Sequence, residues 1–388
     1  MIAMLDPTLP EDVCFVSPNI WPVLADDRSV SMVGGAEVQQ SFLIRGMRDA
    51  GLRVTVLTKT PKQADDFELD GIRIVRIDQG GREIPIIRNI HPRLTSVWKA
   101  LAKTNAAVYC QQCASVDTFV TGLFARFRRR PFIYMGASDP DFQADGVRKK
   151  FCRRGGWRAQ QFYKAGLWLT DTVVAQHGGQ ADDWRQWFGR EATEIPNGYV
   201  APPGSRASQD GVVFWAATVK SLKRPELFLE LARKCPNLRF CMVGGDVPAG
   251  EVGGMFSQIR EAAKEIPNLE FIGYVPFAQV EAYFDRARVF VNTSDFEGFP
   301  NTFLQSWARG IPTVSFFDCQ AKEAGKPIGF ICKTIDEMAD TISKLATDDL
   351  LWEHEGQRAL AYFEAKHSIP QVVERYVQMF AQLRSARS

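Results

Sequence analysis

The sequence lacks long apolar runs. Its histidines and cysteines also lack the spacing that is typical of metal sites and disulfide frameworks. No stretch reaches the roughly eighteen apolar residues that a membrane-spanning helix needs. The first residues, MIAMLDPTLPED, lack the basic start of a signal peptide. The four histidines share no metal-ligand spacing, and the eight cysteines are scattered. We therefore expect a cytoplasmic protein that keeps its thiols reduced and needs no metal.

One pair of cysteines, Cys110 and Cys113, has C-x-x-C spacing. Neither a second pair nor a histidine cluster accompanies it, as a metal site would require. We interpret this segment as the end of a buried strand. A metal or redox site is the alternative.

The formal charge is nearly balanced, at +2, but the charges are unevenly distributed. Between residues 126 and 164, eleven Lys and Arg residues stand against three Asp, with aromatic residues such as Trp157 and Trp168 in and beside the run. Basic residues with interleaved aromatics suit an anionic membrane surface at the inner face of the membrane, or a lipid-linked pyrophosphate acceptor. A solvated surface is the alternative. Nucleic acid is not expected, because no recognition motif accompanies the charge.

Strand and helix patterns alternate along the whole chain. Short apolar, β-branched runs recur, and stretches with helical periodicity separate them. The runs lie at 13–17, 54–58, 107–110, 132–135 and 172–175, and again at 212–217, 238–243, 269–272, 289–292 and 313–317. A hairpin with its turn at Asp70-Gly71 interrupts the first series. Alternation of this kind predicts an α/β protein with two doubly wound, mainly parallel sheets.

The stretch that organises the second half is a strand–loop–helix–strand unit. A strand at 289–292 is followed by a polar loop, a short helix that Asn301 or Thr302 can cap, and a strand at 313–317. Ligands of such units gather at the carboxyl ends of the strands, near helix N-termini. The loop there offers the carboxylate of Glu297.

The run Glu297-Gly298-Phe299 resembles the signature of the retaining glycosyltransferases of family 4, a group that has the GT-B fold and uses nucleotide-diphosphate sugars. Their motif places a second Glu eight positions after the first, and this chain has Gln305 there. The resemblance implies that Glu297 contacts the donor sugar and acts in catalysis, and that Gln305 contacts the nucleotide ribose. An amide can still hydrogen-bond a ribose hydroxyl, but it carries no charge.

Other loops of the second half resemble the family's donor site. Lys223 matches a lysine that neutralises the donor pyrophosphate, whereas Thr218 stands where the family has arginine. Lys220 or Arg224 can supply the missing charge, although neither is at the family position; a solvated charge cluster is the alternative for these two. The glycines and backbone groups after two further strands are expected to approach the nucleotide. The donor-binding residues implied here are Thr218, Lys223, Gly244, Gly245, Tyr274, Val275, Gly298, Phe299, Asn301, Thr302 and Gln305.

In the first half, Gly34 and Gly35 resemble the family's glycine-rich loop, which faces the donor across the cleft. Many relatives also have a histidine after the strand at 132–135, contacting the donor sugar. This chain has none there, so Ser138 or Asp139 can take its place, and we assign Asp139 a catalytic role. The alternative is that Asp139 only caps the turn before Pro140.

The resemblance covers almost the whole chain and implies two Rossmann-like domains facing across a cleft. The expected boundaries are 1–197 for the acceptor-side domain, with the C-terminal helix at 370–388 crossing back to it, and 198–369 for the donor domain. The implied activity is metal-independent, retaining transfer of a hexose to a saccharide or lipid-linked saccharide, with the nucleotide sugar as co-substrate and no cofactor. A non-catalytic homologue that binds a partner is the alternative, and a nucleotide-sugar epimerase is a lesser one.

Overall fold

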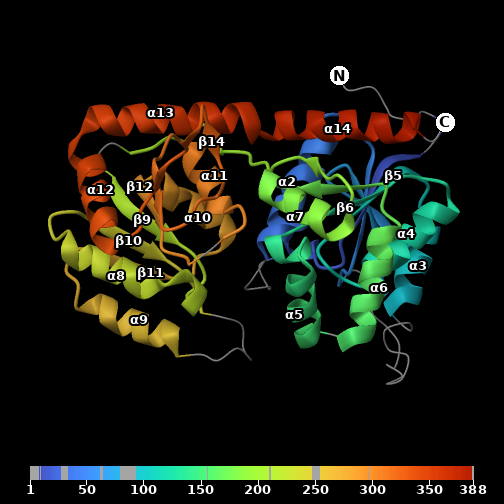
Figure 1. The fold of residues 1–388 in the computed structure, drawn as a ribbon, viewed down its shortest axis with the longest axis horizontal. Coiled ribbons are helices and arrows are strands. Elements are labelled where there is room, and N and C mark those ends of the chain that lie inside the picture. Colours follow the sequence, from blue (N-terminus) through green and yellow to red (C-terminus); the bar gives the residue numbers. More distant parts are fainter. Residues whose placement is uncertain are drawn as a thin grey trace. The chain divides into compact units, whose positions relative to one another are not determined.

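The computed structural model describes residue 8 and residues 10–27, 34–61, 64–78, 93–154, 156–208, 211–246, 254–295 and 297–386. The chain divides into two compact units. Residues 1–198 and 369–388 form the first unit, and residues 199–368 form the second (Figure 1).

The first unit is built on an eight-stranded sheet in the order β3-β4-β2-β1-β5-β6-β7-β8. Every pair of neighbours is parallel except the hairpin β3–β4. Its strands are β1 Glu11–Val16, β2 Val54–Thr58, β3 Asp66–Leu69, β4 Ile72–Arg76, β5 Ala106–Gln112, β6 Phe132–Met135, β7 Thr172–Ala175 and β8 Thr193–Glu194. The strand order reverses between β1 and β5, which makes the carboxyl edge of these two strands the switch point of the sheet.

Helices cover both faces of this sheet, and β1 shows why its residues are apolar on both sides. Val13 and Phe15 pack with α2 and α14, whereas Cys14 and Val16 pack with α3, α4 and α6. The helices are α1 Trp21–Leu24, α2 Gly35–Asp49, α3 Arg93–Ala102, α4 Asp117–Phe127, α5 Ala144–Arg154, α6 Gly156–Trp168, α7 Gly178–Phe188 and α14 Ile369–Ser385, with a 3₁₀ turn η1 at Asp139–Asp141. A strand with both faces covered is buried along its whole length, as β1 is.

The second unit holds a six-stranded parallel sheet in the order β11-β10-β9-β12-β13-β16. Its strands are β9 Val212–Ala216, β10 Phe240–Val243, β11 Leu269–Gly273, β12 Ala287–Asn292, β13 Thr313–Ser315 and β16 Phe330–Ile331. The short strands β14 Lys322–Glu323 and β15 Lys326–Pro327 pair separately and antiparallel. Here the order reverses between β9 and β12, so these strands form the second switch point.

The two faces of the second sheet pack against different helices. Val213, Val289 and Met242 belong to a core shared with α8, α9 and α12. On the other face, Phe214 and Phe290 contact ring partners from α10 and α11. The helices are α8 Pro225–Lys234, α9 Met255–Lys264, α10 Phe277–Phe284, α11 Asn301–Trp307, α12 Ile335–Thr347 and α13 Asp349–Lys366, with a 3₁₀ turn η2 at Ser221–Lys223.

The C-terminal helix returns to the first unit, as expected. The side chains that share one face of α14 are all buried in the core around β1 and α2: Ile369, Val372, Val373, Tyr376, Met379 and Phe380. Gly46 of α2 lies against Ile369 so closely that a Cβ there would clash with its side chain. The doubly wound α/β architecture is therefore confirmed in both units.

Several local expectations need correction. The strand expected at 313–317 ends at Ser315. The helix after Glu297 has Pro300 at its N-cap position, with no side-chain cap, so neither Asn301 nor Thr302 caps it. The hairpin turn is as expected: Asp70 and Gly71 have φ of 50° and 75°, which the two central positions of a type I′ turn require.

Candidate functional site

Lys223 and Glu297 form an ion pair at the switch point of the second sheet. Lys223 lies in η2, shortly after β9, and Glu297 lies in the loop after β12. Because β9 and β12 are parallel neighbours, their carboxyl ends bring the two loops together. Nζ of Lys223 contacts Oε1 of Glu297, and each side chain is 17% exposed. Both partners of the pair are therefore mostly buried but still accessible to solvent.

Hydrogen bonds from β12 and the loop after it fix the Glu297 carboxylate. The Ser294 hydroxyl donates to Oε1 of Glu297 at 2.8 Å. Nδ2 of Asn292 lies 3.5 Å from the same oxygen, and Oδ1 of Asn292 accepts from the Ser294 N–H at 3.0 Å. Side chains from its own strand and loop therefore fix the position of this carboxylate.

A second set of hydrogen bonds joins this loop to the segment that carries Lys223. The Thr293 hydroxyl donates to the Lys223 carbonyl at 2.7 Å and accepts from the Trp215 indole at 3.0 Å. The Asp295 N–H donates to the Leu222 carbonyl at 3.1 Å. Lys223 and Glu297 are therefore positioned by backbone contacts as well as by their own charges.

The glycines after β10 let neighbouring loops approach one another. The Gly244 N–H donates to the Gly273 carbonyl at 2.9 Å, and the Val219 N–H donates to the Gly245 carbonyl at 2.9 Å. A Cβ on Gly244 would clash with the Ala217 carbonyl, and one on Gly245 would lie 2.9 Å from the Tyr274 ring. These contacts place the ends of β9, β10 and β11 in one cluster of loops. Tyr274 is 52% exposed there, and the adjacent Val275 is half-buried.

Thr218 occupies the position where family 4 enzymes have an arginine, and no cation takes that position here. Thr218 is half-buried in the turn after β9. Arg224 adopts a left-handed conformation and pairs with Asp295 at 3.2 Å. The Lys220 side chain is half-buried and has no ion-pair partner among the residues that the structure describes. Of the two possible substitutes for the arginine, Lys220 is therefore the one without a carboxylate partner in the described part of the chain.

Gln305 lies in a buried network instead of the loop cluster. Its side chain is 3% exposed, and Nε2 donates to Oε1 of Glu281 at 2.9 Å. The other Glu281 oxygen accepts from the Tyr199 hydroxyl at 2.6 Å and from Arg309 at 2.8 Å. Arg309 also pairs with Asp285 at 2.7 Å. The structure therefore does not bring Gln305 together with Glu297 and Lys223.

The remaining residues of the expected motif surround the start of α11. Phe299 stacks on His367 with ring centroids 4.8 Å apart and meets Trp307 edge-on at 5.9 Å. Gly298 precedes it, and Asn301 and Thr302 are half-buried in the first turn of the helix. The Thr302 carbonyl accepts from the Ser306 hydroxyl at 2.7 Å.

In the first unit, Asp139 is held by two side chains at the start of α7, the N-cap residue His177 and Gln180 of the first turn. Oδ1 of Asp139 lies 3.1 Å from Nε2 of His177 and accepts from Nε2 of Gln180 at 2.8 Å. Burial opposes ionisation, but the bonds from His177 and Gln180 outweigh it and hold the pKa of Asp139 below its ordinary value. Sequence reasoning missed His177. Its position after β7, next to the end of β6, was the available signal.

Gly34, at the N-cap of α2, lines a cavity of about 480 Å³, whereas Gly35, the first residue of the helix, does not. The cavity lies at the switch point of the first sheet, because segments following β1 and β5 line it together with α2. A volume of this size suits a small-molecule ligand. The structure does not bring Asp139 into this lining.

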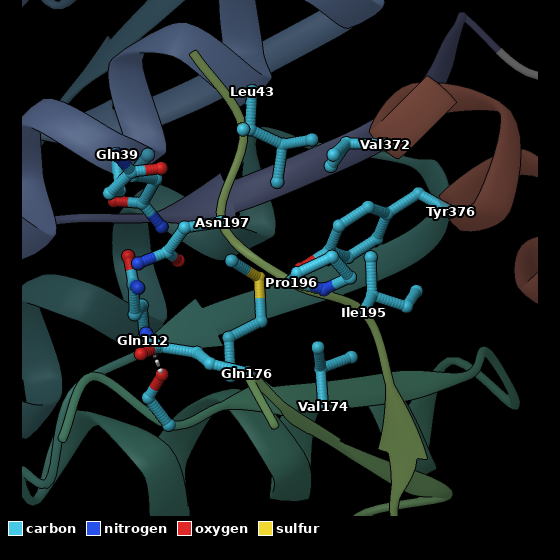
Figure 2. Close-up of a pocket in the computed structure, with 14 residues that line it drawn as sticks. Gln39, Leu43, Gln112, Val174, Gln176, Ile195, Pro196, Asn197, Val372 and Tyr376 are labelled. Atoms are coloured by element: carbon cyan, nitrogen blue, oxygen red, sulfur yellow. Dashed lines mark hydrogen bonds between the residues drawn. The ribbon is translucent and has the colours of Figure 1, made fainter. Parts of the chain in front are cut away.

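A second cavity, of about 20 Å³, lies beside it and has room for about one water molecule. Figure 2 shows the amide side chains of Gln39, Asn197 and Gln112 on one side, facing Leu43 and Tyr376 on the other. Gln40 and Gln112 line both cavities.

The C-x-x-C cysteines carry protonated thiols. Cys110 is fully buried, and burial raises its pKa far above the ordinary value. Burial, with the charges of Asp141 and Glu37, raises the pKa of Cys113 to about 12. Both cysteines are free. Among the described residues, no cluster of His, Cys, Asp and Glu is arranged to hold a metal ion.

The charged run of the first unit lies largely on α5 and α6. Arg148, Lys149 and Arg158 are exposed. The aromatic residues Phe127, Trp157 and Trp168 are 74%, 70% and 66% exposed. The side chains of Arg153 and Arg154 lie outside those that the structure describes. Within the described residues, no helix is long and apolar enough to span a bilayer.

Both halves of the chain match models of glycosyl transferase domains. Residues 34–198 match "Glycosyl transferase 4-like domain", and residues 207–348 match "Glycosyl transferases group 1". No curated protein sequence matched the chain.

Solved structures share the fold over nearly the full chain. The sucrose-phosphate synthase of Thermosynechococcus elongatus is 16% identical, with a TM-score of 0.70 over 97% of this chain and 100% of that one. HepE of Anabaena, in complex with UDP and glucose, is 14% identical, with a TM-score of 0.70 over 96% and 99%. The lipopolysaccharide outer core galactosyltransferase WaaB is 13% identical, with a TM-score of 0.63 over 96% and 99%. The two domain matches and this shared fold together show that the chain belongs to the glycosyltransferases of the GT-B fold.

Proposed function

We propose that this protein transfers a hexose from a nucleotide-diphosphate sugar to a saccharide or lipid-linked saccharide, with retention of anomeric configuration, as family 4 enzymes do. The observation that carries this proposal is the Lys223–Glu297 pair at the switch point of the second sheet. A cation and a carboxylate held together at such an edge can bind a diphosphate and stabilise positive charge on the sugar beside it.

In this proposal each partner of the pair has its own task. Lys223 neutralises charge that develops on the diphosphate as the bond from the anomeric carbon to the diphosphate oxygen breaks. The acceptor oxygen then bonds to the anomeric carbon on the same face, and its proton leaves with the diphosphate. Glu297 accepts hydrogen bonds from the sugar and stabilises its developing positive charge. Asp139, ionised and held by His177 and Gln180, is assigned a contact to a sugar hydroxyl.

The donor is proposed to be a nucleotide sugar because the loops after β9, β10 and β11 cluster around glycines that allow close approach. HepE has been solved with UDP and with UDP-glucose, which is consistent with this class of donor. The acceptor is proposed to belong to cell-surface polysaccharide or glycolipid synthesis. The reaction is proposed to need neither metal nor cofactor, since Lys223 supplies the charge.

A thermal-shift screen against nucleoside diphosphates and their sugars tests the donor assignment. A ligand that binds the folded protein alone raises the melting temperature by mass action. Transfer from the best donor, in the presence of a metal chelator, is then followed by proton NMR of the product's anomeric signal. A product with the donor's anomeric configuration supports retention, and the opposite configuration rejects it.

A non-catalytic homologue is the second candidate, and the position of Gln305 favours it. The residue that should contact the ribose is buried on Glu281, and Thr218 adds no charge. Such a protein would still bind a nucleotide through Lys223. Nucleotide binding without transfer from any donor would select this candidate over the enzyme.

We also propose that α5, α6 and the end of α4 dock the protein on an anionic membrane surface. Exposed cations at Arg148, Lys149 and Arg158 lie in the same segment as the exposed ring of Trp157. Cations near an anionic surface and aromatic rings at the interface both favour adsorption without a membrane-spanning segment.

A further inference from the structure

The cavity of about 480 Å³ in the first unit carries an inference that rests on the proposed function and extends it to the acceptor. Both polar and apolar side chains line it. Ser17, Gln40, Gln111, Gln112 and Asp117 supply hydrogen-bonding groups, and Ile20, Val116 and Phe151 supply apolar ones. Saccharides present hydroxyl groups and C–H faces side by side, so a mixed lining of this kind suits them.

Two side chains of the lining have polar atoms that the described part of the protein leaves without a hydrogen-bond partner. Gln40 is 3% exposed, and its Nε2 has no acceptor; Oε1 of Gln112 has no donor. The other end of the Gln40 amide accepts from the Ser17 hydroxyl, which fixes its orientation. A hydroxyl group can accept from one amide and donate to the other, so an alcohol matches this pair better than an ester or ether does.

Among the described residues, the charged side chains of the lining leave no net positive charge for an anionic occupant. Glu37 folds back against Gly34 so closely that a Cβ there would clash with its carboxylate. The N-terminus of the fifteen-residue helix α2 therefore already has an anion beside it. Lys150 is tied to the fully buried Asp141 at 2.5 Å. The positive charge of the exposed Lys59 is offset by the negative charge of Asp117 in the same lining.

The thiol in the lining adds no charge that would change this balance. Cys113 lies between Gln112 and Ala114, and its raised pKa, about 12, keeps the sulfur protonated. A ligand that carries hydroxyls and no phosphate or carboxylate is thus the chemistry that the lining fits.

We propose that this cavity binds a neutral pyranoside, the acceptor end of the saccharide that receives the transferred sugar, and that Gln40 and Gln112 together hydrogen-bond one of its hydroxyls. Glu37 accepts from a second hydroxyl and excludes phosphorylated or acidic sugars from the start of α2. These three residues then determine which acceptor is used.

The test uses the full chain without nucleotide, and saturation-transfer-difference NMR as the readout, because single sugars bind weakly. The probes are the methyl glycosides of glucose, galactose, mannose and N-acetylglucosamine, compared with glucose 1-phosphate and methyl glucuronide. At least one neutral glycoside should bind, and it should bind more tightly than either charged sugar. Binding of none of the neutral glycosides, or preference for a charged sugar, would overturn the inference.

Variants of the lining locate the site. Gln112→Met keeps the length of the side chain and removes its hydrogen bond, so affinity for the neutral glycoside should fall by about three- to tenfold. Gln40→Met should act in the same direction, with circular dichroism as the check that it folds. Gln161→Met, an exposed glutamine on α6 outside the lining, is the matched control and should bind as the wild type does. An unchanged affinity in Gln112→Met would mean that buried water, not the sugar, satisfies these amides.

Glu37→Gln tests the exclusion of anions. It keeps the size of the side chain and removes the charge at the start of α2, so glucose 1-phosphate should gain affinity relative to methyl glucoside. A ratio equal to that of the wild type would contradict the role of Glu37. Failure of this inference can be distinguished from failure of the proposed function. If the wild type binds a neutral glycoside but no nucleotide, the saccharide site stands and the transferase is rejected. If it binds a nucleotide but no glycoside, the donor site stands and the saccharide site is rejected.

Discussion

Glu297 accepts a hydrogen bond from Ser294 and contacts the Lys223 ammonium, so its role in hydrogen bonding can be separated from its role as a charge. Glu297→Gln keeps the size and most of the hydrogen bonding and removes the charge. We predict that kcat falls by about tenfold to a thousandfold, while affinity for the nucleoside diphosphate changes little. Steady-state kinetics and calorimetric titration measure the two effects. An unchanged kcat would show that Glu297 only positions the donor.

The buried position of Gln305 leads to a prediction about stability. A carboxylate there would face Glu281 at hydrogen-bond distance, with no donor between them. We therefore expect Gln305→Glu to lower the free energy of unfolding by about 1–3 kcal/mol, measured by urea unfolding at neutral pH. Donor affinity should be kept or improved only if the new side chain leaves Glu281 and reaches the ribose.

The matched control for this variant exchanges the two side chains. Glu281→Gln with Gln305→Glu keeps one carboxylate and one amide beside Arg309, so it should be more stable than Gln305→Glu alone. If Gln305→Glu alone were as stable as the wild type, the hydrogen bond between Gln305 and Glu281 would be contradicted. Loss of all nucleotide binding in Gln305→Glu would indicate a remodelled pocket.

Among the elements, α6 packs against α4 through a glycine, and this contact supports the basic segment of the first unit. A Cβ on Gly166 would lie 2.5 Å from the backbone nitrogen of Phe119. Because backbone cannot move aside as a side chain does, Gly166→Ala should destabilise the protein by about 1–3 kcal/mol. Gly178→Ala, at the start of α7, is the control, since the nearest atom would be 3.6 Å away. Thermal unfolding compares them, and equal melting temperatures would refute the close packing of α4 and α6.

Most elements could be predicted from the sequence because their periodicity is local. The strand at 132–135 and the strand at 172–175 have the expected bounds, and the C-terminal helix returns to the first unit as expected. Two-residue strands such as β8 and β16 could not be predicted, because pairing with a neighbour, not their own sequence, defines them.

The site was predictable in part for the same reason. A lysine and a glutamate after neighbouring strands meet wherever those strands are adjacent, so the motif placed Lys223 and Glu297 together. The burial of Gln305 depends on Glu281, Arg309 and Tyr199, which come from separate segments. The bond between Asp139 and His177 likewise joins residues 38 positions apart. Neither contact has a local signal.

For the whole molecule, the charged segment of the first unit predicts adsorption to anionic lipid. Each cation near such a surface contributes about 1 kcal/mol, and salt screens the attraction. Co-sedimentation should be strong with anionic vesicles, weak with neutral ones, and reduced by added salt. Replacing Arg148, Lys149 and Arg158 with Ser should weaken it.

The control for lipid binding removes the same number of exposed cations elsewhere. Replacing Arg233, Arg260 and Lys264 with Ser, on α8 and α9 of the second unit, should leave sedimentation unchanged. Equal binding to neutral vesicles, or equal loss in both triple variants, would leave the segment as an ordinary solvated surface.

The proposed function depends most directly on one contact, that of Lys223 with the diphosphate of a nucleotide sugar. Calorimetric titration of the nucleoside diphosphate that stabilises the protein most, into the wild type and into Lys223→Ala, tests it directly. Loss of this charged contact is expected to cost about 2–4 kcal/mol, or roughly thirty- to a thousandfold in affinity, with an unchanged circular dichroism spectrum. If Lys223→Ala bound that nucleotide as tightly as the wild type, the assignment of the donor site to the Lys223–Glu297 pair would be wrong.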